Sequence, residues 1–333
     1  MTTLVIAAGR DLLIARRGAR WTVEHHLRGA SPESLAADPM DLRRIYAGTM
    51  GNGLWRSEDG GRTWTRVGTS IAQAVVTAVA ASSTEQDVVY AGTEPSAVYR
   101  SDDAGGTWRE LTGLRSLPSA SSWSFPPRPD THHVRWIQAD PGAAGRVFVA
   151  IEAGALVRTE DGGRSWVDRV RGGPIDTHTA ATHPLAPGRV YSAAGDGYFE
   201  SRDAGRSWTR LVDGLRHRYL VGVAVDPADP EVVVVSAAPG PWVAYQPENA
   251  EAYVYRKSGG GPFIPAMQGL PDGRGTVAGR LAAHPGEPGA MYSANNHGVF
   301  RSGDGGATWQ ILDIPWPRTA FAGGVDALIV LPA

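Results

Sequence analysis

The stretch RSEDGGRTW at residues 56–64 decides the fold of this chain, because the same residue types return in the same order four more times. The other copies occupy residues 100–108, 158–166, 200–208 and 301–309, and each reads Ser/Thr-x-Asp-Gly/Ala-Gly-x-Thr/Ser-Trp. The spacing predicts a tight turn between two strands, in which Asp59 accepts backbone N–H bonds and Gly61 supplies the positive φ that residues with a Cβ avoid. We refer to the five copies as the box turns, and we expect their tryptophans to be largely buried.

A second pattern comes before the box turns: a short strand of mostly small residues ends in Asp-Pro or His-Pro and is followed by a strand with an aromatic or aliphatic residue. Residues 2–26 supply only three strands, whereas residues 325–331 form a surplus strand with no box turn after it. Repeats of this period, with the first unit completed from the other end of the chain, are typical of β-propellers. We therefore predict an all-β single domain over residues 1–333, a seven-bladed β-propeller with four antiparallel strands per blade and a first blade closed by the C-terminal strand.

Composition excludes several classes of partner and site. The net charge of −2 over 333 residues argues against a nucleic acid or an anionic membrane as a partner. The chain has no Cys, so it can form neither a disulfide nor a thiolate–metal site. The apolar run at residues 4–8 is too short for the core of a signal peptide and has no basic residue before it, so we expect a cytoplasmic protein.

The box turns closely resemble the Asp-box of the BNR (bacterial neuraminidase repeat) family, and this resemblance covers essentially the whole chain. It implies a sialidase-like propeller fold and does not specify one chemistry. Sialidases of this superfamily have six blades and an Arg-Ile-Pro motif, whereas this chain has Arg44-Ile45-Tyr46 and seven predicted blades, so we do not expect sialidase activity. Xyloglucan-active relatives use two propellers that face each other. A single seven-bladed propeller is similar to the photosystem II assembly factor, which binds a partner protein and does no chemistry.

The two ends of the predicted disc differ in their residues. The box turns and the turns between first and second strands lie on one end, the box face. The turns between second and third strands and the connections between blades lie on the other end, the loop face, which by analogy with other propellers holds the ligand site. Seven of the nine histidines fall on the loop face, although exposed loops also tolerate histidine without a function.

The candidate site residues come from this loop face. The predicted catalytic residues are His133, Arg135, Glu152, His178 and Asp196. The predicted metal ligands are His25, His133, His178, His217 and His297, and the expected aromatic lids are Trp123, Trp242 and Trp316. Neutral imidazoles with a carboxylate favour zinc, iron or copper. No His-x-His or His-Glu-x-x-His spacing supports this set, and we expect His133 and His178 to lie close enough to share a ligand.

Two functions from different classes follow from the sequence. The first is an enzyme that acts on a small-molecule or saccharide-like ligand in the central funnel, a hydrolase or lyase with a metal to assist the reaction. The alternative is a non-catalytic propeller that binds a ligand or a protein partner. A stoichiometric metal would favour the enzyme, and a flat polar loop face would favour the binding propeller. The fold alone does not choose between them, but histidines gathered beneath aromatic loops favour the enzyme.

Overall fold

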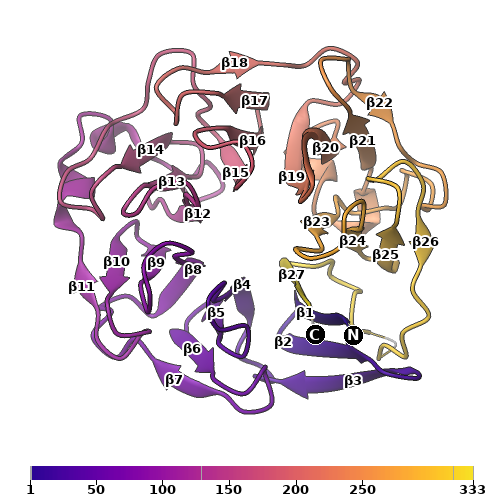
Figure 1. Cartoon of the computed structure of the whole chain (residues 1–333), viewed down its shortest axis with the longest axis horizontal. Helices are drawn as coiled ribbons and strands as arrows, with labels where there is room; N and C mark the ends of the chain where they lie inside the picture. The colour runs from indigo at the N-terminus through magenta and orange to yellow at the C-terminus, as the bar shows by residue number, and fades with distance from the viewer. Residues whose placement is uncertain (1, 129, 318, 333) are drawn as a thin grey trace.

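The computed structural model describes residues 2–128, 130–317 and 319–332. Within these residues, seven antiparallel sheets stand around a central axis as the blades of a propeller (Figure 1). The predicted all-β, seven-bladed architecture is confirmed, and the described part of the chain has four short 3-10 helices and no α-helix. These 3-10 helices are η1 (Thr112–Ser116), η2 (Ala120–Ser122), η3 (Pro241–Val243) and η4 (Pro247–Asn249).

The blades are numbered in chain order, and the strands of each are given from the axis to the rim. Blade 1 contains β27 (Ala327–Pro332), β1 (Thr2–Ala8), β2 (Asp11–Arg17) and β3 (Trp21–His26). Blade 2 contains β4 (Pro32–Ala37), β5 (Ile45–Thr49), β6 (Leu54–Ser57) and β7 (Thr65–Val67). Blade 3 contains β8 (Val75–Ala81), β9 (Val89–Glu94), β10 (Val98–Ser101) and β11 (Arg109–Glu110). Blade 4 contains β12 (Val134–Ala139), β13 (Val147–Ile151) and β14 (Ala155–Thr159). Blade 5 contains β15 (Thr177–Thr182), β16 (Val190–Ala194), β17 (Gly197–Ser201) and β18 (Thr209–Arg210). Blade 6 contains β19 (Tyr219–Asp226), β20 (Asp229–Ala238), β21 (Tyr253–Lys257) and β22 (Ile264–Pro265). Blade 7 contains β23 (Arg280–Ala283), β24 (Met291–Asn295), β25 (Gly298–Ser302) and β26 (Gln310–Ile311).

Blade 4 departs from the expected four strands. Its outer strand is reduced to a single bridge between Arg158 and Val167. The chain then turns toward the segment around η1 and η2, where the Asp168 carboxylate accepts hydrogen bonds from the backbone N–H and the hydroxyl of Ser119. At its rim the fourth blade therefore has only this one bridge of strand pairing. The chain there instead contacts the long connection that precedes the blade.

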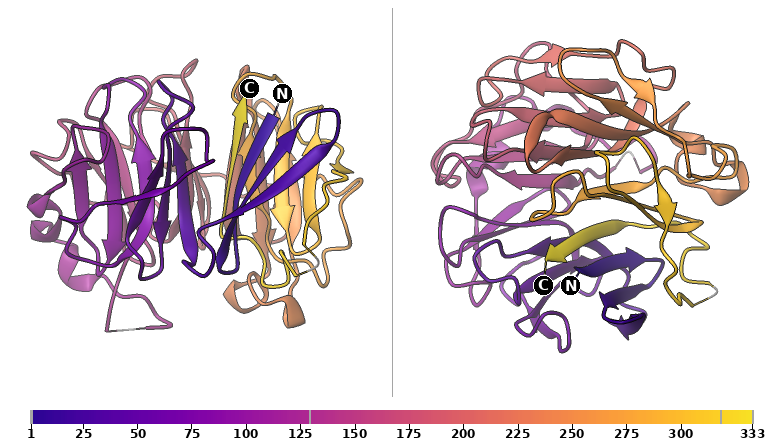
Figure 2. Two further views of the ribbon diagram at one scale, coloured as in Figure 1. Left: turned by 90° about the horizontal axis from the view of Figure 1, so that it is seen from below. Right: turned by 45° about the vertical axis from the view of Figure 1, so that its right-hand side comes forward.

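The ring closes as the repeat count predicts. Strand β27 pairs antiparallel with β1, with Leu4 opposite Val330 and Ile6 opposite Leu328. The two chain ends lie side by side in the views of Figure 2. Alternate residues of β1 pack on different neighbours, because Leu4 and Ile6 belong to the core shared with blade 7, whereas Val5 and Ala7 belong to the core shared with blade 2. The first blade is therefore buried on both faces although its strands come from opposite ends of the chain.

Each box turn is held by the same hydrogen bonds. In the first copy, the Ser57 hydroxyl donates to Asp59 Oδ1 at 2.8 Å and accepts from the backbone N–H of Gly61. Asp59 also accepts from the backbone N–H and the hydroxyl of Thr63, at 2.8 and 2.6 Å. Gly61 has a φ of +90°, as expected for its position in the turn. The sequence prediction for these turns is therefore confirmed, and their carboxylates have structural partners.

The five box-turn tryptophans are less uniform than expected. Trp108 and Trp309 are buried, with 7% and 3% of their surface exposed. Trp64, Trp166 and Trp208 are partly buried, and each packs against a hydrophobic core. Their outer strands at the rim have no further blade layer outside them, and part of each indole ring remains at the surface.

Arginines on third strands join neighbouring blades. Arg16, Arg56 and Arg158 each donate at 2.7 Å to a backbone carbonyl in the box turn of the following blade. Arg256 makes the equivalent bond to Gly305 O at 2.9 Å. Blade 5 has Glu200 on its third strand instead, and the next blade is the one whose box turn has degenerated to residues 256–263. Glu200 pairs with Arg189 and Arg202 of its own blade. The replacement in blade 5 therefore coincides with the missing turn in blade 6, whereas in blade 3 the third-strand Arg100 pairs with Glu85 and Asp102 instead of with the next box turn.

No helix in the described part of the chain has the length and apolar character needed to cross a membrane. The cytoplasmic location stays a prediction.

Candidate functional site

Irregular pairing at the start of the inner strands aims polar side chains at the propeller axis. The first strands of blades 2 to 6 each have a register shift within their first few residues. A β-bulge leaves one residue outside the regular pairing and redirects its side chain, and bulges are frequent next to active sites. The residues passed over by these shifts are Glu33, Thr77, Arg135, His178 and Val221. The first four of them line the central channel.

Three side chains from blades 4 and 5 turn polar atoms toward one another. Glu152 follows β13, Asp176 precedes β15, and His178 is the bulged residue of β15. His178 Nε2 lies 3.6 Å from Asp176 Oδ2 and 3.9 Å from Glu152 Oε1. One ligand atom from each residue lies within 4.8 Å of the others. The two distances from His178 are close to the roughly 3.4 Å between neighbouring ligands of a tetrahedral metal with bonds of about 2.1 Å.

The opposite side of each group is already fixed by a hydrogen bond. His178 Nδ1 lies 2.6 Å from the Leu220 carbonyl oxygen, so Nδ1–H is the donor, and Nε2 is an acceptor in the neutral ring. The Ala153 backbone N–H donates to Asp176 Oδ1 at 2.8 Å, and Glu152 Oε2 lies 2.6 Å from His133 Nε2. Support of this kind orients the ligands of metal sites.

Glu152 is held in its ionised form. Burial alone would raise the pKa of Glu152, but the positive charge of Arg135 and then the His133 hydrogen bond outweigh it and lower the pKa to about 2. Arg135 Nε lies 3.4 Å from Glu152 Oε2, and its Nη1 lies 3.3 Å from Glu33 Oε1. At neutral pH this carboxylate can therefore accept a cation or a proton donor, but it does not carry a proton itself.

An aromatic pocket opens beside the three groups. Its volume is about 420 Å³, and both Glu152 and Asp176 line it. Its other walls are mainly rings, contributed by Phe125, Pro126, Pro127, Tyr219, Pro241, Trp242 and Tyr245. The Tyr219 hydroxyl lies 3.2 Å from His178 Nε2 and 3.4 Å from the Tyr245 hydroxyl. A ligand in this pocket would have apolar ring faces around its body and charged groups at one end.

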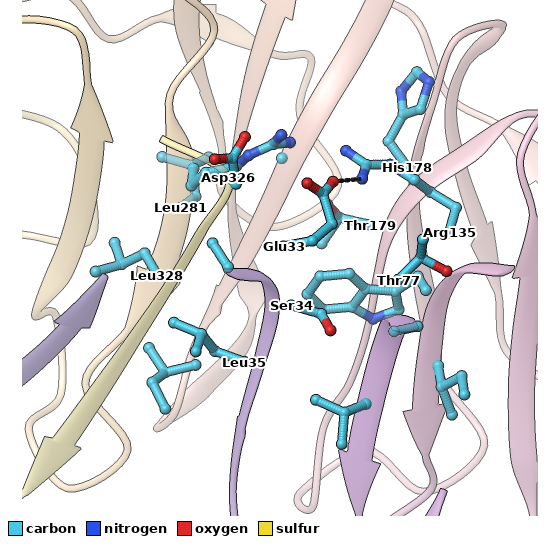
Figure 3. A pocket seen from close by; sticks show the side chains of 18 residues that line it. Glu33, Ser34, Leu35, Thr77, Arg135, His178, Thr179, Leu281, Asp326 and Leu328 are labelled. Carbon is cyan, nitrogen blue, oxygen red and sulfur yellow. Dashed lines mark hydrogen bonds and ion pairs between the residues drawn. The ribbon is translucent and has the colours of Figure 1, made fainter. Parts of the chain in front are cut away.

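The central channel lies on the other side of His178. It has a narrower cavity of about 60 Å³ and is lined by residues of the inner strands, including Arg135, His178, Arg280 and Asp326. Figure 3 shows the ion pair between Glu33 and Arg135, with Asp326 across the channel from Arg135. Burial, and then the negative charge of Glu33, raise the pKa of Asp326 to about 7. His178 borders the channel, and its ring nitrogen meets the hydroxyl of the pocket residue Tyr219.

The structure brings together four of the predicted catalytic residues, His133, Arg135, Glu152 and His178. Both histidines face Glu152 rather than each other. Asp196 lies beside Asp176 and does not line the aromatic pocket. Its Oδ1 is buried without a hydrogen-bond partner among the described residues, and burial raises its pKa.

Three of the predicted metal ligands are engaged elsewhere. His25 lies on β3, the rim strand of blade 1, with its Nδ1 3.7 Å from Asp11 Oδ2. His217 stacks on Tyr253 and contacts the Tyr255 hydroxyl at 2.7 Å. His297 is exposed, with Nε2 3.1 Å from the Gly275 carbonyl oxygen. The prediction grouped them by face, but residues on one face of a disc can lie at its centre or at its rim.

Of the three expected lids, one lines the pocket. Trp242 is 75% exposed and forms part of the aromatic wall. Trp123 is buried in a core shared by blades 3 and 4, and its indole N–H donates to the Ser119 hydroxyl at 3.1 Å. Trp316 packs edge-on against Phe321 at 5.0 Å. The lid prediction is therefore wrong for Trp123 and Trp316, because their loops fold back onto the blades.

The candidate set taken from the sequence was built on histidines and contains neither of the two pocket tyrosines. Tyr219 is the first residue of β19, and Tyr245 belongs to the long segment after β20. Aligning the starts of the inner strands would have found Tyr219, because it stands at the same end of its strand as Arg135 and His178. Tyr245 has no such signal, since only the folding of its loop places it there.

This chain is similar to known proteins in its three-dimensional structure and not in a sequence match to a family or a curated protein. No protein-family model and no curated protein matches the sequence. Solved structures with a similar fold include a GH74 enzyme from Niastella koreensis, with a TM-score of 0.69, 17% identity, and coverage of 92% of this chain and 53% of that one. The GH74 xyloglucanase from Xanthomonas campestris has a TM-score of 0.66, 18% identity, and coverage of 93% and 54%.

A single-propeller neighbour is similar over nearly its full length. The structure of YCF48 bound to D1 peptide has a TM-score of 0.57, 17% identity, and coverage of 85% of this chain and 82% of that one. This chain spans about half or less of the GH74 chains that it matches. At these identities the likeness shows the fold, a seven-bladed propeller whose structural neighbours include GH74 enzymes and YCF48.

Proposed function

We propose that the loop face holds a divalent metal between Glu152, Asp176 and His178, and that the metal acts on a small molecule bound in the aromatic pocket. The observation that carries this proposal is the orientation of the three groups. Their outer atoms are satisfied by His133, the Ala153 N–H and the Leu220 carbonyl, and their inner atoms are three acceptors that face one another. Three converging acceptors are stabilised by a cation placed among them.

The donor set refines the expected metal. One imidazole and two carboxylates suit zinc, iron(II) or manganese. The sequence favoured zinc, iron or copper, because it predicted several imidazoles with a carboxylate. A metal in this position would polarise an oxygen of the ligand or activate a water molecule for hydrolysis, or stabilise the charge formed in an elimination. Tyr219 lies close enough to exchange a hydrogen bond with the ligand, and the aromatic walls would orient a ring such as a sugar or an aromatic group.

The first experiment measures metal directly. Protein purified without an affinity tag would be analysed for its elements, and metal-free protein would be titrated calorimetrically with zinc and with manganese. We expect one metal per chain, and at least about a 100-fold loss of affinity in Glu152→Gln and in Asp176→Asn. Glu58→Gln is the matched control, since Glu58 is 63% exposed and lies on the box face.

A wild-type protein with no metal and no measurable affinity for either ion would overturn the metal site. If metal binds, a panel of chromogenic esters, phosphoesters and glycosides tests for turnover. Turnover that disappears after chelation and returns with metal would support the enzyme.

The alternative function is binding of a peptide or protein without chemistry. The exposed ring of Trp242 beside prolines favours it, because aromatic and proline-lined surfaces are common in peptide recognition. The structural neighbour YCF48 has been solved with a D1 peptide. If no metal binds, but proteins captured by wild type are lost with Trp242→Ala, the loop face is a binding surface.

A further inference from the structure

Arg280 differs from the other arginine of the central channel because it has no ionic partner. It begins β23, and its Nε donates to the Val325 carbonyl oxygen at 2.9 Å. Across the described residues, it forms no ion pair and its two Nη atoms have no hydrogen-bond partner. Arg135, by contrast, pairs with both Glu33 and Glu152. The charged fork of Arg280 is therefore available to a ligand.

The surroundings of Arg280 leave its positive charge incompletely balanced. Burial, and then the nearby charge of Arg135, lower the pKa of Arg280. Glu33 is already paired with Arg135. Asp326 is the other carboxyl group near Arg280, and burial and the negative charge of Glu33 raise its pKa, which disfavours its charged form. An added anion would restore the balance.

Arg280 lies in the channel, near one wall of the aromatic pocket. Its guanidinium carbon lies 6.0 Å from the ring centre of Tyr245, which is a wall of that pocket. Arg280 also lines the channel together with Arg135 and His178. Tyr245 is thus both a wall of the aromatic pocket and a neighbour of the Arg280 guanidinium.

We infer that Arg280 binds an oxyanion of the ligand, a carboxylate, sulfate or phosphate group, while the ring portion of the same molecule lies in the aromatic pocket. The planar fork of a guanidinium can donate two parallel hydrogen bonds to such a group. This inference rests on the proposed function in one respect, since it takes the aromatic pocket as the ligand site. It then specifies the substrate class as an anionic, ring-containing small molecule.

Anion binding can be measured without the metal. Metal-free protein in a buffer without oxyanions would be titrated calorimetrically with inorganic phosphate, sulfate and acetate, which distinguishes the three anion types. We expect the preferred anion to bind wild type and to lose at least about tenfold in affinity with Arg280→Gln. Arg280→Lys should retain part of the affinity, because it keeps a charge and loses the fork. Arg164→Gln is the control, since Arg164 is exposed on the box face.

Each outcome decides a separate point. Equal binding by wild type and by a folded Arg280→Gln protein overturns the inference, and so does a wild type that binds none of the three anions. If Arg280→Gln does not fold, unchanged affinity in Arg280→Lys would count against recognition through the fork. The zinc affinity of Arg280→Gln should equal that of wild type. A wild type that binds anions through Arg280 but binds no metal would keep this inference and reject the metal site.

Discussion

The box face and the loop face of this propeller are built on different principles. Within each box turn, hydrogen bonds join residues two to four positions apart, and the same set recurs in all five copies. On the loop face, the bonds that orient Glu152 and His178 join residues 19 and 42 positions apart. The comparison teaches that repeated short-range turns supply the framework, whereas the candidate site depends on long-range contacts.

The largest expected effect is that of Trp309→Ala on the box face, which should lower stability without changing metal affinity on the loop face. Trp309 is 3% exposed, and its indole N–H donates to the Ala266 carbonyl oxygen at 3.1 Å. Its removal should lower the free energy of unfolding by about 3–5 kcal/mol, as for other buried aromatic residues. Denaturant unfolding measures this loss, and metal affinity of the folded fraction should stay at the wild-type value. The exposed Trp242→Ala is the control and should leave stability nearly unchanged.

The opposite pattern is expected for Gly195→Ala. A Cβ at this position would lie 2.1 Å from Asp176 Oδ2, and the end of that side chain can rotate away. We expect a folded protein whose affinity for zinc falls by about 10- to 100-fold, because a ligand has lost its orientation. Gly260→Ala is the control, since nothing lies within 4 Å of its added carbon. Unchanged zinc affinity in Gly195→Ala would remove Asp176 from the metal site.

A smaller effect is expected where one blade is joined to the next. Arg158 is 8% exposed and donates at 2.7 Å to the Gly205 carbonyl oxygen of the following blade. Replacing it with Ala leaves that carbonyl without its partner, which should cost about 1–3 kcal/mol in unfolding free energy. Thermal and urea unfolding of Arg158→Ala would be compared with Arg164→Ala in the same box turn. Equal stability of the two variants would mean that these arginines do not join the blades.

The smallest effect concerns how the free energy of unfolding changes at acidic pH. Hydrogen bonds from the hydroxyl and the backbone N–H of Ser165 lower the pKa of Asp161 to about 2. A carboxylate with a depressed pKa in the folded state stabilises the protein above its unfolded-state pKa of about 4 and loses this contribution as the pH falls through about 2. The difference in unfolding free energy between wild type and Asp161→Asn should therefore shrink between pH 4 and pH 2. A constant difference across this range would show that the charge of Asp161 does not matter.

The sequence by itself determined the framework. The box turns, the count of seven blades and the closure by β27 follow from residues whose partners lie nearby in the chain or recur at a fixed period. It also placed His133, Arg135, Glu152 and His178 on one face, because the end of a strand at which a residue stands can be read from the repeat. Even the replacement of arginine by Glu200 is visible beside the degenerate turn of blade 6.

Only the tertiary structure decided which of these residues meet. Arg135 and His178 reach the axis because bulges interrupt the regular alternation of β12 and β15, and no residue pattern in either strand marks a bulge. The Leu220 carbonyl of the next blade sets the tautomer of His178, and the fold of the segment after β20 brings Tyr245 to the pocket. His25 shares the face but lies at the rim. Distance from the axis is a property of the closed ring, so local sequence determined the strands while the packing of blades determined the site.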